Sequence, residues 1–189
     1  MNRLITLLCF IALFHACHTP KYISYGDIHG TLNFENGKWL LNKIKAPSSL
    51  VSSLTDITVN EFSSLLGNRF STVYETKQLM LPKELPETLS KSTLLDIKNG
   101  TGFDFFITVR AKRLSNDMGS LQIGKNYSEK LNSGLVTLEI YDLNLQQKIY
   151  SKTVQGNLTV EENDNSLVFG KSSNGLMISS LKKILRKLG

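Results

Sequence analysis

Three strand-like runs in the second half of the chain constrain its fold most strongly. The first covers residues 103–111, the second covers 135–143, and the third, 148–154, follows a turn signal at Asn144. Apolar and polar residues alternate in these runs, which is typical of strands that bury one face. We therefore expect an antiparallel meander, with residues 115–134 forming a loop because that stretch is too long for a tight hairpin.

The first run also predicts which side chains share a face of the sheet. A two-residue period places Phe103, Phe105, Ile107 and Val109 on one face and Asp104, Phe106, Thr108 and Arg110 on the other. Because Phe106 interrupts the polar pattern of the second set, we expect both faces of the sheet to be at least partly covered.

Apolar residues recur at helical spacing in residues 54–70 and 175–188, and a further helix is expected over 86–98, where Pro86 suits the first turn. Within the first of these, Thr58-Val59-Asn60-Glu61 fits a capping box, which favours a helix start at that point. Asn99-Gly100 suits the end of the helix expected over 86–98.

Shorter segments of β character lie between these helices. Residues 22–25 and 71–76 favour strands, and residues 31–34 and 38–45 flank Asn36-Gly37, a turn signal that predicts a hairpin. The order of elements predicts an α+β fold, with a mixed or antiparallel sheet and helices packed on it.

The amino terminus has the anatomy of an export signal. Arg3 supplies a positive charge, and residues 4–14 form an apolar run that is too short to span a bilayer as a helix. The run ends at Ala16-Cys17 and resembles the signals of bacterial lipoproteins of the Bacteroidetes type, in which the cysteine is acylated and becomes the first mature residue. An ordinary secretory signal with an incidental cysteine is the alternative.

This resemblance divides the chain into three parts. We expect residues 1–16 to be a signal peptide, residues 17–30 to be a tether lipidated at Cys17, and residues 31–189 to form one α+β domain. Acylation would hold the protein at a membrane. The residue directly after the cysteine is His18 and not an aspartate. By resemblance to known sorting rules, this implies the outer membrane, with the body facing the periplasm.

The body carries a second resemblance, in residues 99–109, 136–142 and 149–151. Gly102 and Asp104 precede an apolar strand, and Asp142 lies at the turn of the next hairpin. This pattern resembles a superfamily of bacterial envelope proteins. It includes the curli-secretion channel lipoprotein, the penicillin-binding-protein activator lipoproteins and the amino-terminal domain of the Tol-system periplasmic protein. The resemblance implies a fold that serves protein contact or assembly. The residues themselves predict that both aspartates form turns.

One motif points to a different class of protein. Tyr25-Gly26-Asp27-Ile28-His29-Gly30 resembles the first signature of the metallophosphoesterases, in which the Asp and His of a D-x-H pair bind one of two metals. Asp27 and His29 are therefore weak metal candidates. A two-metal site needs further histidines, and none follows His29. A tether loop explains the motif more simply, and we expect no cofactor.

Charge and composition exclude further classes. Of the 22 lysines and arginines, one lies in the signal and four lie near the carboxyl terminus, so the rest nearly balance the 16 acidic residues. A general nucleic-acid-binding surface is therefore not expected. Nucleophilic triads and phosphate-binding glycine loops also lack their required residues.

The last helix is amphipathic and basic. Its apolar stripe consists of Met177, Leu181, Ile184, Leu185 and Leu188, and its cations are Lys182, Lys183, Arg186 and Lys187. Such a helix can pack on the sheet or lie on an anionic membrane, and the stripe favours packing. The sequence predicts a lipid-anchored, non-enzymatic envelope protein that binds another envelope protein or helps to assemble it. A metal-dependent phosphoesterase is the alternative.

Overall fold

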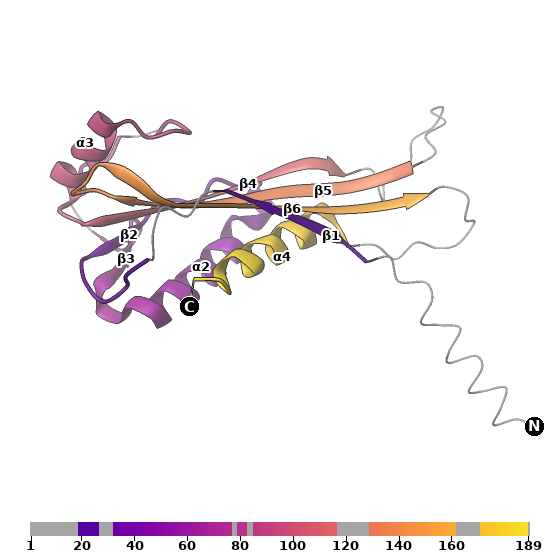
Figure 1. Ribbon diagram of the computed structural model, residues 1–189, viewed down its shortest axis with the longest axis horizontal. Helices are drawn as coiled ribbons and strands as arrows, with labels where there is room; N and C mark the ends of the chain where they lie inside the picture. The colour runs from indigo at the N-terminus through magenta and orange to yellow at the C-terminus, as the bar shows by residue number, and fades with distance from the viewer. Residues whose placement is uncertain are drawn as a thin grey trace, which may run out of the picture.

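The computed structural model describes residues 19–26, 32–76, 79–82, 85–116, 129–161 and 171–188. They form an α+β fold built on one mixed six-stranded sheet with the strand order β1-β6-β5-β4-β2-β3 (Figure 1). The predicted fold class is confirmed.

The meander is the largest part of the sheet. Its strands are β4 (Phe105–Asn116), β5 (Glu129–Asp142) and β6 (Gln147–Glu161), paired antiparallel in sequence order as predicted. The strands are longer than expected, because residues 129–134 belong to β5 and do not form a loop: all six pair with β6, and residues 132–134 also pair with β4. The remaining part of the predicted loop, residues 117–128, lies outside the described residues.

One edge of the sheet is β1 (Lys21–Tyr25), which pairs antiparallel with β6. The strand expected at residues 22–25 is therefore present, and it brings a segment that begins four residues after Cys17 into the sheet.

The predicted hairpin around Asn36-Gly37 is wrong. β2 (Trp39–Leu41) lies between β4 and β3 (Phe70–Thr72) and is parallel to both. All three β2 residues are buried, which a central strand requires and a two-stranded hairpin could not provide. Gly37 still turns the chain, with a φ of 81°, and a Cβ there would lie 2.6 Å from the ring of Phe105.

Two helices cover one face of the sheet, which we call the α2/α4 face (Figure 1). They are α2 (Ser48–Leu66), followed by the 3-10 turn η2 (Gly67–Arg69), and α4 (Ser173–Leu185). The predicted capping box is wrong, because Thr58 lies inside α2, is buried, and donates its hydroxyl to the Leu54 carbonyl at 2.7 Å.

The third helix, α3 (Lys91–Thr101), lies on the opposite face, which we call the α3 face, near one end of the sheet (Figure 1). It starts later than expected because Ser90 provides the cap, accepting a hydrogen bond from the Thr93 amide at 3.1 Å. It ends at Gly102, whose left-handed backbone (φ 71°) suits a glycine, and not at Asn99-Gly100 as predicted.

Each face has its own hydrophobic core. The larger core, on the α2/α4 face, contains Ile107 and Val109 of β4, and the smaller one, under α3, contains Phe106. Both faces are thus covered in part, as expected. Phe103 is the exception: it belongs to the smaller core because it precedes β4 and does not follow the strand's alternation.

Two paired glycines allow α4 to approach the sheet closely. Gly134 of β5 lies opposite Gly156 of β6, and a Cβ at Gly134 would lie 2.5 Å from the Met177 side chain. All described strands, helices and core residues fall between residues 21 and 188, so a chain of residues 18–189 keeps the complete described fold.

Candidate interaction surface on the open part of the sheet

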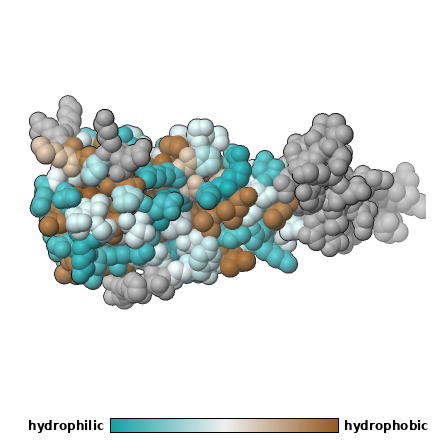
Figure 2. Space-filling view, turned by 90° about the horizontal axis from the view of Figure 1, so that it is seen from above, coloured by the Kyte–Doolittle hydropathy of each residue, from teal (hydrophilic) through white to brown (hydrophobic). Residues whose placement is uncertain are grey.

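The α3 face is covered by a described helix only near the end where α3 lies. Beyond α3, two rows of directly paired residues cross four strands, and we call these eight residues the open surface. One row is Lys112, Leu135, Gln155 and Ile23, and the other is Arg110, Thr137, Thr153 and Tyr25. Figure 2 looks onto this side of the molecule and shows hydrophilic and hydrophobic residues interspersed on it.

The β1 end of the open surface presents apolar side chains to solvent. Ile23 is 55% exposed and Tyr25 is 48% exposed. Lys21 is the only charged residue of β1, and no described strand pairs with the outer edge of β1. Edge strands of soluble proteins are usually protected by charges, bulges or covering segments, so this edge is suited to pairing with another chain.

At the other end of the open surface, Arg110 belongs to an ionic cluster centred on Glu139. Its Oε2 lies 2.8 Å from Nη2 of Arg110 and accepts a hydrogen bond from the Tyr141 hydroxyl at 2.9 Å. Its Oε1 accepts from Nζ of Lys148 at 3.0 Å. Both carboxylate oxygens are thus held by donors.

The electrostatics of this cluster follow from burial and pairing. Burial alone raises the pKa of Glu139, but Lys148, Arg110 and Tyr141 outweigh it, so the pKa lies below its ordinary value. Burial and the neighbouring Glu139 charge raise the pKa of Tyr141. A carboxylate stabilised in this way is a poor proton acceptor, and the arrangement fixes β4, β5 and β6 to one another.

Asp142 forms a turn as the sequence predicts, whereas Asp104 links segments that are distant in the sequence. Asp104 accepts hydrogen bonds from the Lys38 amide, from Lys98 at 2.7 Å and from Asn144 at 3.2 Å, joining three segments. Burial raises the pKa of Asp104, but these hydrogen bonds and the Lys98 charge outweigh it, so the pKa lies below its ordinary value. Asp142 accepts from the amides of the turn residues Asn144 and Leu145.

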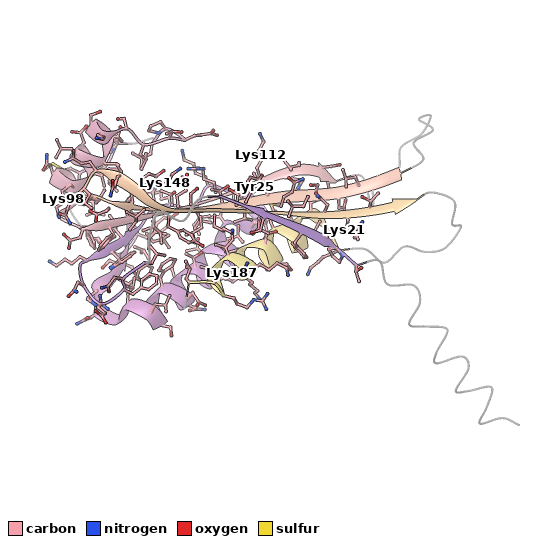
Figure 3. The ribbon with its side chains drawn as sticks, in the orientation of Figure 1. Lys21, Tyr25, Lys98, Lys112, Lys148 and Lys187 are labelled. Carbon is pink, nitrogen blue, oxygen red and sulfur yellow. The ribbon has the colours of Figure 1, made fainter. Side chains whose placement is uncertain are left out.

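The structure places the apolar residues of the carboxyl-terminal helix in the larger core. Met177, Leu181 and Ile184 have no exposed surface, and Leu185 and Leu188 are also buried. Lys182, Arg186 and Lys187 are exposed, and Lys183 is partly buried. Figure 3 shows Lys187 and Lys112 on opposite sides of the sheet.

Cys17, Asp27 and His29 lie outside the described residues. In the part of the chain that is described, no three His, Cys, Asp or Glu side chains gather as a metal site would require. None of the helices described has the length and apolar character to cross a membrane.

Sequence reasoning missed the open surface. Exposure of Ile23 and Tyr25 depends on the pairing of β1 with β6, which no local pattern encodes. The sequence did contain a signal for the ionic cluster, because Glu139 is a charged residue within the apolar run Val136–Ile140. In the structure it pairs with Arg110 and Lys148 on the neighbouring strands.

No protein-family model matches the chain, and no curated protein matches it significantly. Solved structures do resemble it. The PelC dodecamer from Paraburkholderia phytofirmans has a TM-score of 0.48 at 12% identity, over 90% of this chain and 97% of that one.

Two other similar structures are the LpoB C-terminal domain from Salmonella enterica and the lipoprotein GNA1162 from Neisseria meningitidis. The LpoB domain has a TM-score of 0.37 at 15% identity, over 67% of this chain and 84% of that one. GNA1162 has a TM-score of 0.39 at 9% identity, over 80% of this chain and 99% of that one. These scores describe a loose likeness in chain path to bacterial proteins, one of them a lipoprotein.

Proposed function

We propose that this chain is a lipid-anchored, non-enzymatic protein of the bacterial cell envelope that binds another envelope protein through β1. The observation that carries the proposal is the exposed edge strand with Ile23 and Tyr25 pointing to solvent. A partner strand could add to this edge through backbone hydrogen bonds, and the two apolar side chains would give it specificity.

The proposed anchor lies next to this strand in the sequence. Only three residues separate Cys17 from Lys21, the first residue of β1. Acylation of Cys17 would therefore hold the binding edge near the membrane surface, where membrane-bound partners are concentrated. The outer membrane, with the body in the periplasm, is the proposed location.

The ionic groups of the described sheet support a non-enzymatic role. Glu139 and Asp104 have lowered pKa values and fixed hydrogen-bond partners, so each is explained by its structural contacts. The Asp27 and His29 pair offers the start of a metal site only.

Photo-crosslinking tests the binding surface. A photoreactive residue placed at Tyr25 of the acylated protein should give one discrete product with an envelope protein in living cells. The control is the same residue at Tyr74, which is 60% exposed but lies just beyond β3 at the other edge of the sheet. Equal products at both positions, or none at Tyr25, would contradict the proposal.

A separate experiment tests the anchor and the class of protein. Cys17→Ala should abolish incorporation of labelled palmitate, and retained label in that variant would refute lipidation. Metal analysis of the chain of residues 18–189 tests the alternative, since stoichiometric manganese, iron or zinc would favour the phosphoesterase.

A further inference from the structure

A groove runs between β1 and the carboxyl-terminal end of α4, on the face of the sheet opposite the open surface. It encloses about 470 Å³. Its lining residues, which define what we call the basic groove, are Tyr22, Ser24, Val154, Lys183, Arg186 and Lys187.

The basic groove has a strongly one-sided charge. Three of its six lining residues are cations and none is acidic. Across the described part of the chain, neither Lys183, Arg186 nor Lys187 lies within ion-pair distance of a carboxylate. Their charges are therefore available to an anionic ligand.

Contacts within the protein also fix part of the groove. The Lys183 ammonium lies 4.6 Å from the centre of the Tyr22 ring, a cation–π contact that keeps this charge on the wall of the groove. Val154 is 3% exposed and provides an apolar floor, and the Ser24 hydroxyl can donate a hydrogen bond. Arginine can bind two phosphate oxygens at once, while lysines act as point charges.

The position of the groove in the chain indicates the source of the anion. Tyr22 follows Cys17 by five residues, which span at most about 18 Å when fully extended. If Cys17 is acylated, as proposed above, the groove is held within reach of the headgroups of the same membrane.

We propose that the basic groove binds the phosphate groups of anionic membrane lipids. This inference rests on the proposed anchor for its choice of ligand. It assigns the two sides of β1 different roles: Tyr22 and Ser24 face the membrane lipid, while Ile23 and Tyr25 face the protein partner.

The alternative explanation for these cations is the helix dipole, whose negative end at the carboxyl terminus of α4 favours positive charge. Lys182 separates the two explanations. It is exposed near the same helix end but does not line the groove. It is therefore a matched control for the loss of one charge.

The test uses the chain of residues 18–189, which keeps the described fold and lacks the anchor. Sedimentation with vesicles of phosphatidylcholine containing 30% phosphatidylglycerol should show binding, and vesicles of pure phosphatidylcholine should show little. Lys183→Gln, Arg186→Gln and Lys187→Gln should each weaken binding about fivefold, and the triple variant about 100-fold. Lys182→Gln should change it less than twofold.

A second pair of variants adds a negative charge to β1 instead of removing a positive charge from the groove. Ser24→Asp places a carboxylate in the groove and should weaken vesicle binding about as much as the loss of a cation. Ile23→Asp adds the same charge to the opposite side of β1 and should have a smaller effect. Both positions are exposed, and thermal melts check that each variant remains folded.

Three results would overturn the inference. Equal losses for Lys182→Gln and the groove variants would show that net charge alone attracts the protein. Equal binding to both kinds of vesicle would exclude anionic headgroups. Tight binding of inorganic phosphate without vesicle binding would assign the groove to a soluble anion. None of these results depends on palmitate incorporation or on crosslinking at Tyr25, so the two proposals can fail separately.

Discussion

The two faces of the sheet are covered in different ways, although they share the same strands. The α2/α4 face is apolar along β4, β5 and β6 and is packed against two helices. The α3 face has a small apolar core at one end and beyond it carries threonines and the Glu139 cluster. The comparison indicates that helix packing stabilises the α2/α4 face, whereas the part of the α3 face beyond α3 is not covered by any helix in the described part of the chain.

The sharpest test of this comparison removes α4. Its buried residues Leu176, Met177, Leu181, Ile184 and Leu185 each contribute about 1.5–3 kcal/mol by burial. Their sum is comparable to the whole stability of a typical domain, about 5–15 kcal/mol. Deleting residues 176–189 from the chain of residues 18–189 should abolish cooperative thermal unfolding, followed by circular dichroism. Unchanged thermal stability would show that the face does not depend on α4.

A single core residue gives the next largest effect. Ile107 is fully buried on the α2/α4 face, so Ile107→Ala should lower the free energy of unfolding by about 2–5 kcal/mol in urea titrations. Leu145 is 62% exposed, and Leu145→Ala should change it by less than about 0.5 kcal/mol. A negligible effect at Ile107 would mean that the burial of β4 is misassigned.

The ionic cluster of the α3 face should contribute less and should depend on pH. Glu139→Gln removes the charge that pairs with Arg110 and Lys148 and should cost about 1–3 kcal/mol at pH 7. Because the folded pKa of Glu139 is lowered, its contribution is present above the unfolded pKa and disappears as the pH falls through the folded value.

The stabilities of the wild type and Glu139→Gln should therefore converge in acid and separate as the pH rises above the ordinary glutamate range. Urea titrations at several pH values measure this difference. A pH-independent gap would mean that Glu139 acts through packing and not through its charge.

Two threonine substitutions on the α3 face should have the smallest effects on the free energy of unfolding. The Thr108 hydroxyl is buried and has no hydrogen-bond partner among the described residues, so Thr108→Val should be neutral or stabilise the protein by up to about 1 kcal/mol. Thr137 and Thr153 hydrogen bond to each other at 2.9 Å, and Thr137→Val should cost about 1 kcal/mol. Urea titration distinguishes the two variants, and equal costs would reveal a partner for Thr108.

Local patterns predicted the parts of the fold that depend on local sequence. Alternation in the three long strands gave the meander, and Ile107 and Phe106 were placed on opposite faces. The start of α2 was not predicted, because the helix begins at Ser48, directly after Pro47, and not at Leu54 or Thr58.

The position of β2 could not be predicted because it is a three-residue strand whose partners lie far away in the sequence. Trp39 pairs with both Phe70 and Phe105, and only the assembled sheet determines this order. The candidate surface was missed for the same reason, since the exposure of Ile23 and Tyr25 depends on the pairing of β1 with β6.

The pairing of β1 with β6 also determines the order in which the protein can assemble. Tyr22 lies opposite Gly156, about 130 residues later, so the first strand to be synthesised has its only described partner in the last. Contacts this distant in sequence form slowly, because closing a long loop costs entropy before any contact is gained. The segment that follows Cys17 therefore docks late, only after β6 has been made.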